Sequence, residues 1–197
     1  MKVAKKISRE FNMSTLFSKS GRDNTDAALA VLQEGIRQYA IKQVVIASTH
    51  GDTGIKAATL LKDMNINIVV VTHNVGFKEP GQVEMTSAIR NELESYGVKV
   101  LTGTMPFRNI GTAIREKLGS SQQDLVANVL RMFCQGVKVG VEIAMMASDA
   151  GLITPDDVLT VAGTGRGADT VVLISPRPSN QMFDLKIRDI LAKPAYW

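Results

Sequence analysis

Small polar residues and histidines follow two of the most apolar runs in this chain, at the point where each run ends. The apolar run at 44–47 is followed by Ser48, Thr49, His50, Gly51, Asp52, Thr53 and Gly54, and the run at 66–71 is followed by Thr72, His73 and Asn74. Hydroxyls, backbone N–H groups and imidazoles are donors with which proteins hold anionic groups. Both stretches are therefore candidates for an anion-binding site.

The first stretch also stands at the start of a predicted helix. Ile55, Ala58 and Leu61 recur at helical spacing directly after it, while the valines and isoleucine before it are typical of a buried parallel strand. A helix N-terminus presents unpaired N–H groups and the positive end of the helix dipole. We expect a phosphate or carboxylate at 48–54, with Asp52 capping a helix that begins near Thr53.

A glycine-rich stretch near the end of the chain is a second candidate. Gly163, Thr164, Gly165, Arg166 and Gly167 separate two strand-like runs at 158–162 and 170–174. A dinucleotide fingerprint needs a helix after its glycines, and a Walker phosphate loop needs a Gly-Lys-Ser/Thr triplet; the sequence contains neither. Two interpretations stay open, an anion-holding loop with one guanidinium and a hairpin without a ligand.

Other residues with chemical potential carry weaker signals. His50 and His73 are either ligand contacts or loop residues bonded to backbone, and without a Cys or carboxylate pattern beside them no metal site is predicted. Glu142 interrupts a very apolar helix, so we expect it to be buried and paired. Cys134 is expected to be a small buried hydrophobe. Phe77 either covers a planar ring or anchors its loop.

Alternating patterns predict an α/β fold. Helical spacing over 24–40, 53–64 and 85–96 alternates with strand-like runs at 44–47, 66–72 and 98–101, which indicates a parallel sheet. Three extra helices, at 110–118, 125–133 and 137–146, precede the strand at 158–162. We predict a three-layer domain over 13–197 with a mostly parallel five-stranded sheet, its last strand, 170–174, antiparallel, and an amphipathic segment at 183–191. Strand carboxyl ends share one edge, so the candidates meet there.

Composition limits the classes of function. The 197 residues are 45% hydrophobic and carry a net charge of +4, but most of the excess lies in a basic arm at 1–12 without interleaved aromatic residues, so nucleic-acid binding is not expected. One cysteine argues against a disulfide-built secreted domain. No apolar run is long enough to span a bilayer, and no signal peptide is recognised. We expect a cytoplasmic protein without membrane contact.

Two of these stretches resemble a known family. Ser48-Thr49-His50-Gly51-Asp52-Thr53-Gly54 is similar to the effector-phosphate loop of the C-terminal α/β domain of pyruvate kinase, and the residues from Val161 to Thr170 are similar to the last loop of that domain. The resemblance covers most of 15–190 and is closer to the small stand-alone proteins of the superfamily. The catalytic (β/α)₈ barrel, which takes about 250 residues, is missing, so transfer from phosphoenolpyruvate to ADP is not expected.

The resemblance also implies a ligand. Stand-alone members are associated with flavin mononucleotide (FMN), and Asp52 stands where the effector loop often has a basic residue, which disfavours a second phosphate. FMN or a similar monophosphate is therefore expected at Ser48–Gly54, with Thr72–Asn74, Gly163–Gly167 and the segment Ser20-Gly21-Arg22 as other walls. Flavin-dependent oxidoreduction would follow. The alternatives are a regulatory module that senses a phosphorylated metabolite through homo-oligomer contacts, and a purely structural loop.

Overall fold

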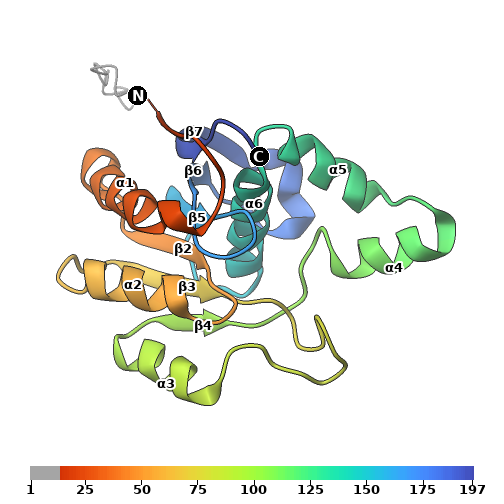
Figure 1. Cartoon of the computed structure of the whole chain (residues 1–197), viewed down its shortest axis with the longest axis horizontal. Coiled ribbons are helices and arrows are strands. Elements are labelled where there is room, and N and C mark those ends of the chain that lie inside the picture. The colour runs from red at the N-terminus through yellow and green to blue at the C-terminus, as the bar shows by residue number, and fades with distance from the viewer. Residues whose placement is uncertain (1–13) are drawn as a thin grey trace, which may run out of the picture.

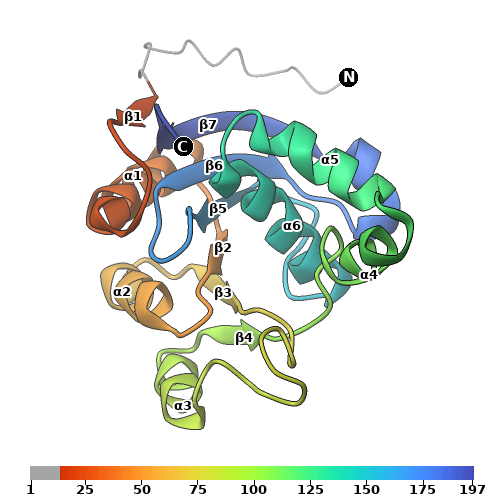
Figure 2. The same cartoon turned by 45° about the vertical axis from the view of Figure 1, so that its right-hand side comes forward.

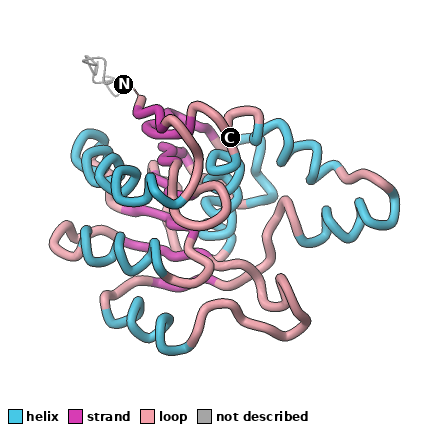
Figure 3. Tube along the Cα trace, viewed as in Figure 1, coloured by secondary structure: helices cyan, strands magenta, loops and turns pink. Residues whose placement is uncertain are grey.

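A seven-stranded sheet forms the middle layer of the protein. The computed structural model describes residues 14–197, so the basic arm predicted at 1–12 lies outside the described residues. Figure 3 shows the strands stacked through the centre of the molecule. In spatial order β1-β7-β6-β5-β2-β3-β4, the strands are β1 (Thr15–Phe17), β7 (Lys186–Pro194), β6 (Thr170–Ser175), β5 (Val158–Ala162), β2 (Gln43–Ala47), β3 (Asn67–Val71) and β4 (Lys99–Leu101).

Helices cover both faces of this sheet, which confirms the predicted three-layer α/β fold. One face carries α1 (Thr25–Tyr39), α2 (Asp52–Leu61) and α3 (Ser87–Ser95). The other carries α6 (Gln135–Asp149), with α5 (Gln122–Arg131) and α4 (Asn109–Leu118) further out. Figure 1 shows this division, and Figure 2 views the sheet between its two helical layers. Two short 3₁₀ helices, η1 (Arg22–Asn24) and η2 (Ser179–Asp184), complete the described elements.

Alternating side chains of the central strands fill two hydrophobic cores. In β2, Val44 and Ile46 pack in the core beneath α1 and α2, while Val45 packs in the core beneath α6. Successive side chains of a strand point to opposite faces, so a strand covered on both faces has to be apolar throughout. This requirement explains why the continuous apolar run at 44–47 marks a central strand.

The prediction of five strands is wrong, because two more strands extend one edge. The β5–β6 pair is antiparallel, as the sequence predicts, but β6 is not the last strand: β7 pairs antiparallel with β6, and β1 pairs parallel with β7. The amphipathic segment expected at 183–191 therefore lies largely within β7. Its pairing with β6 shifts register twice, between Val171 and Val172 and again between Leu173 and Ile174. Such irregularities break the alternation that would reveal a strand.

The order of the strands creates a switch point at β2. From β2 the chain proceeds outward through α2, β3, α3 and β4, and then returns through α4, α5 and α6 to β5 on the other side of β2. The loops that follow β2 and β5 therefore leave the same sheet edge in different directions. In open α/β sheets the crevice between such loops is the usual place for a ligand.

Candidate functional site

A cavity of about 510 Å³ lies at the carboxyl edge of β2, β3 and β5. Its walls come from the loop after β2, the long loop between β3 and α3, the glycine loop after β5, and the starts of α4 and α6. The volume lies within the range of roughly 300–1,000 Å³ that is usual for small-molecule sites. The candidates that are far apart in the sequence thus converge, as the parallel-strand pattern predicts.

Ten of the fifteen predicted site residues line this cavity, and five do not. Those in the walls are Ser48, Thr49, His50, Asp52, Thr53, His73, Gly163, Gly165, Arg166 and Gly167. Those outside the walls are Gly51, Gly54, Thr72, Asn74 and Thr164. These ten wall residues come from the segments that follow β2, β3 and β5, so three separate segments of the chain form this part of the site.

The loop after β2 offers open backbone donors at the start of α2. The Ser48 hydroxyl accepts a hydrogen bond from the Gly54 N–H at 3.1 Å, which occupies one of the donors at the helix start. Within residues 14–197, no hydrogen bond engages the N–H groups of Asp52 or Thr53, or the Thr53 hydroxyl. Unpaired N–H groups at a helix N-terminus favour an anion.

Gly51 is the N-cap of α2, and the cap predicted for Asp52 is wrong. Gly51 has φ 99°, a left-handed value that favours glycine, and a Cβ there would lie 2.1 Å from Cγ2 of Ile89. Asp52 is the first residue of the helix and makes no capping hydrogen bond. Its carboxylate lies 3.7 Å from the Arg166 guanidinium, so these two side chains join the β2 loop to the glycine loop.

Asp169, which is fully buried, holds the glycine loop in place from behind. One oxygen of its carboxylate accepts hydrogen bonds from the N–H groups of Thr164, at 3.1 Å, and Gly21, at 2.9 Å. A Cβ on Gly167 would lie 2.7 Å from Cα of Arg22, so the segment Ser20-Gly21-Arg22 supports the loop and is not a wall of the cavity. The N–H groups of Gly165, Arg166 and Gly167 have no acceptor in the described part of the chain.

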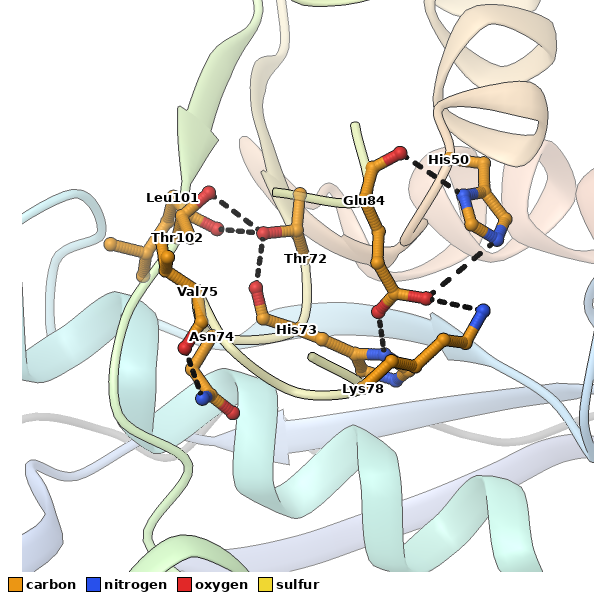
Figure 4. A network of polar contacts seen from close by, with 9 residues as sticks. All are labelled: His50, Thr72, His73, Asn74, Val75, Lys78, Glu84, Leu101 and Thr102. Carbon is orange, nitrogen blue, oxygen red and sulfur yellow. Dashed lines mark hydrogen bonds and ion pairs between the residues drawn. The ribbon is translucent and has the colours of Figure 1, made fainter. Parts of the chain in front are cut away.

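A single carboxylate ties the β3–α3 loop to both histidines. Glu84 is 6% exposed; its side chain contacts His73 Nδ1 at 2.7 Å, Lys78 Nζ at 2.8 Å and His50 Nε2 at 4.0 Å. Its backbone carbonyl also lies 3.3 Å from Nδ1 of His50. Figure 4 shows the three side chains converging on this residue. Burial alone would raise the pKa of Glu84, but the hydrogen bonds from Lys78 and His73 and their charges lower it below its usual value.

Thr72 and Asn74 turn away from the cavity. The Thr72 hydroxyl bonds to the His73 carbonyl at 2.8 Å and to the Thr102 hydroxyl at 2.7 Å, toward β4. The Asn74 amide donates to the Val75 carbonyl at 2.7 Å, and both arrangements are visible in Figure 4. Of the polar stretch that follows β3, only His73 lines the cavity.

An aromatic pair with a guanidinium forms another part of the cavity wall. The rings of His73 and Phe77 stack with centroids 3.8 Å apart, and the Arg108 guanidinium lies 4.4 Å from the Phe77 centroid. Arg108 has no carboxylate partner among residues 14–197, in contrast to Lys78 and Arg166. It is therefore the one cation of the cavity walls that no described carboxylate balances.

Sequence reasoning missed several residues of these walls. Lys78 and Glu84 belong to the long loop after β3, whose position at the carboxyl edge was a usable signal. Arg108 and Gln135 stand at the starts of α4 and α6, where no capping motif marks the helix start. Ala47 and Val139 complete the set. Arg108, Gln135 and Val139 are recognisable only when the path of the chain is known.

The prediction that Glu142 is buried and paired is confirmed. Its carboxylate accepts hydrogen bonds from Lys138 Nζ and, at 2.8 Å, from the Phe107 N–H, and both ionised side chains are at most 5% exposed. Burial lowers the pKa of Lys138, while the charge and hydrogen bond of Glu142 oppose that shift. Cys134 is also buried, as expected, with Sγ 3.4 Å from the Thr170 hydroxyl.

Comparisons with known proteins do not show which family the chain belongs to. No family model matches the sequence. A hydrogen sulfide-producing enzyme from Fusobacterium nucleatum is 18% identical, with a TM-score of 0.32 over 56% of this chain and 32% of that enzyme. O-ureido-L-serine synthase is 16% identical, with a TM-score of 0.31 over 73% of this chain and 51% of its own. The chain thus spans a third to a half of these enzymes, and similarity this low carries no conclusion on function.

Two further findings bear on the class of site. Within the described residues, no group of three or more His, Cys, Asp or Glu side chains is arranged to hold a metal ion. In the same part of the chain, no helix is both long and apolar enough to cross a membrane.

Proposed function

We propose that this protein binds FMN, or a similar phosphate monoester attached to a planar ring, with the phosphate between the start of α2 and the glycine loop. One observation carries the proposal: unpaired N–H groups of both loops, the Thr53 hydroxyl and the Arg166 guanidinium border the same cavity. Backbone donors at a helix start together with a guanidinium are the groups that bind phosphate best. The resemblance to the C-terminal domain of pyruvate kinase, and a cytoplasmic location, belong to the same proposal.

The charges of the walls favour one phosphate over two. Asp52 is balanced by Arg166, and Glu84 by Lys78, which leaves the positive charge of Arg108. A bisphosphate would bring at least three negative charges against this balance, whereas a monoester brings at most two.

The aromatic wall suits a ring. His73 and the Arg108 guanidinium, which cover the Phe77 ring, would lie along a planar group held in the cavity, and stacking on imidazole faces and guanidinium planes is favourable for such groups. When bound, the flavin supplies the electron-transfer chemistry, and the protein binds and orients it. An oxidoreductase activity then follows from the cofactor, and catalytic side chains stay unassigned.

The experiment compares FMN with riboflavin, which has the same ring without the phosphate. We expect FMN to bind more tightly than riboflavin. Arg166→Ala should lower the affinity for FMN by roughly 10- to 100-fold, because the variant loses one charge-assisted contact with the phosphate. Riboflavin affinity should not change. Arg37→Ala, an exposed arginine of α1 that pairs with Glu34, is the matched control. Equal affinity for both flavins, or no visible flavin absorbance and no thermal shift with either, would contradict the proposal.

The second candidate is a regulatory module that senses a phosphorylated metabolite. It is favoured by the exposed apolar side chains of α4 and α5, through which a module could contact other subunits. This function predicts a thermal shift with sugar phosphates, and no oxidation of reduced nicotinamide in the presence of an electron acceptor. Mass spectrometry of the small molecule that co-purifies with the protein separates the two functions directly.

A further inference from the structure

The two histidines of the cavity wall are almost equally exposed but make different contacts. The side chain of His50 is 37% exposed and that of His73 is 36% exposed. Both ring nitrogens of His50 face Glu84: Nδ1 lies 3.3 Å from its backbone carbonyl, and Nε2 lies 4.0 Å from its carboxylate. His73 faces Glu84 with Nδ1 alone, at 2.7 Å. Within residues 14–197 no hydrogen bond reaches Nε2 of His73, so this nitrogen is open to a ligand.

The carboxylate of Glu84 determines which nitrogen of His73 carries a proton. One oxygen, Oε2, contacts His73, while the other, Oε1, contacts Lys78 at 2.8 Å, as Figure 4 shows. Burial would raise the pKa of Glu84, but the hydrogen bonds and charges of Lys78 and His73 keep that pKa below its usual value. An ionised carboxylate accepts hydrogen bonds and cannot donate one. Nδ1 is therefore the donor, and in the neutral imidazole Nε2 carries the lone pair.

Phe77 holds the plane of the His73 ring. The two rings stack with centroids 3.8 Å apart and an angle of 23° between their planes. Phe77 thus covers one face of the imidazole, Glu84 occupies the side with Nδ1, and the part left exposed includes the edge with Nε2. Both aromatic residues line the cavity. An imidazole that donates from one nitrogen to a carboxylate and leaves the other nitrogen open is the arrangement of a general base.

We propose that His73 is the general base of the cavity and takes a proton from the hydroxyl group of an alcohol substrate, with Glu84 as its positioning residue. The inference rests on the proposed function, because the oxidant is the bound flavin. The O–H bond of the substrate breaks, its proton moves to Nε2 of His73, and its electron pair forms the carbonyl bond of the product. The hydrogen of the adjacent C–H bond leaves with both electrons of that bond to the flavin. The alcohol thus loses two hydrogens and two electrons and becomes an aldehyde or ketone.

The imidazolium that forms on His73 has an adjacent counter-ion. Its Nδ1–H still donates to the Glu84 carboxylate, which carries the opposite charge. The two cations nearby have contacts of their own: Lys78 is bound to the other oxygen of Glu84, and the Arg108 guanidinium lies 4.4 Å from the centroid of the Phe77 ring. An alcohol needs a base because its hydroxyl proton has to leave as the carbonyl forms. The open lone pair on Nε2 therefore suits an alcohol better than a carbonyl compound, which would need a proton donor.

The first test measures the reactivity of Nε2 without any flavin. Diethyl pyrocarbonate acylates an imidazole nitrogen that carries a lone pair, and peptide mass spectrometry follows the product at each histidine. We expect His73 to react several times faster than His50, which is equally accessible but has both ring nitrogens turned toward Glu84. Equal rates at the two histidines would overturn the proposal.

Glu84→Gln separates positioning from a merely structural role. Loss of the charged hydrogen bond should slow the reaction of His73 roughly tenfold. If Glu84 only fastens the loop, the substitution should have the opposite effect, because a looser loop exposes His73 and speeds its reaction; that result contradicts the proposal. Glu79→Gln, at an exposed residue of the same loop, is the matched control and should leave the rate unchanged.

The second test measures alcohol oxidation with FMN bound. At least one of 2-propanol, glycerol and lactate, added in the absence of oxygen, should bleach the visible absorbance of the flavin. His73→Gln should slow the bleaching by roughly 100- to 10,000-fold, the contribution of a general base, whereas His50→Gln should slow it far less. If FMN binds but no alcohol bleaches it, or if bleaching is equally fast after His73→Gln, the proposal is overturned. A chain that binds no FMN fails the proposed function and with it the oxidation, while the reagent still decides whether Nε2 of His73 is the open nitrogen.

Discussion

Two carboxylates of this protein, Glu84 and Glu142, each hold a lysine, but in different surroundings. Glu142 and its partner Lys138 are both nearly inaccessible, and the Phe107 N–H provides a third group. The side chain of Glu84 is nearly as inaccessible as that of Glu142, but its partners reach it from the surface: the Lys78 side chain is 59% exposed and the His73 side chain is 36% exposed. One pair belongs to the interior of a helix layer, and the other fastens a surface loop to the wall of the cavity.

The directions of the pKa shifts express this difference. For Lys138, burial is the largest effect and lowers the pKa despite the charge of Glu142. For Glu84, burial would raise the pKa, but the hydrogen bonds and charges of Lys78 and His73 outweigh it and lower the pKa. Desolvation is the largest single effect on both groups, but it sets the direction of the pKa shift only for Lys138, whereas for Glu84 the hydrogen bonds and charges of Lys78 and His73 together exceed it. Removing one partner should therefore be far more harmful in the first cluster than in the second.

The largest effect is expected for Glu142→Gln. The variant leaves the Lys138 ammonium buried without a counter-ion, which should lower the free energy of unfolding by about 3–5 kcal/mol. Denaturant unfolding measures it. The control is the double replacement of Lys138 by methionine and Glu142 by leucine. It removes both charges, so its free energy of unfolding should fall much less. A loss below about 1 kcal/mol in the single variant would remove the distinction between the clusters.

A smaller effect is expected for Glu84→Gln. The amide can keep some of the hydrogen bonds but not their charge, so the free energy of unfolding should fall by about 1–2 kcal/mol. Protease cleavage within the loop that joins β3 to α3 should become faster, because Glu84 fastens this loop. Glu79→Gln, an exposed residue of the same loop, is the matched control. Equal cleavage of both variants would show that the Glu84 contacts do not hold the loop.

The contribution of Glu84 should disappear in acid. The pKa of Glu84 is lower in the folded protein than its usual value of 4.5, so the unfolded state binds more protons in this window and acid favours unfolding. The stabilisation is complete above pH 4.5 and is lost as the pH falls through the folded pKa. The difference in unfolding free energy between wild type and Glu84→Gln should therefore be constant near neutrality and shrink in acid. If the difference in unfolding free energy grows in acid, the pKa of Glu84 is not lowered in the folded protein.

The smallest effect is expected for Lys78→Met. Because Lys78 is largely exposed, losing its ion pair should change the free energy of unfolding by less than about 1 kcal/mol. Glu84 keeps its contact with His73 in this variant. Thermal unfolding of Lys78→Met and Lys138→Met compares the stability that is lost when the same substitution removes an exposed lysine and a buried one. A loss as large for Lys78 as for Lys138 would contradict the contrast drawn above.

Sequence reasoning predicted the parts of the molecule that have a regular apolar pattern. The β2 run and the two strands around the glycine loop follow from continuous apolar runs of strand length, and the burial of Glu142 follows from the apolar helix around it and the high desolvation free energy of a charge. The convergence of His50, His73 and Arg166 follows from one rule, that parallel strands end at a common edge. These predictions need no knowledge of side-chain packing.

The parts that were missed depend on contacts without a period. The irregular register of β7 conceals a strand, and β1 has only three residues. Arg108 reaches the cavity only because the chain turns there into α4. The exposure of Leu125, Val129 and Phe133 could not be predicted, because a helical period identifies an apolar face but not the direction in which that face points.

The pairing of β1 with β7 has a consequence for how the chain folds during synthesis. Thr15 lies opposite Ala192, and the Ala195 N–H donates to the Phe17 carbonyl at 2.7 Å. These contacts join segments at opposite ends of the described chain, so the sheet edge cannot close until nearly all of residues 14–197 have left the ribosome. Contacts this distant in sequence slow folding. We therefore expect nascent chains to expose the β6 edge until the last strand arrives, a state in which chaperone binding is favoured.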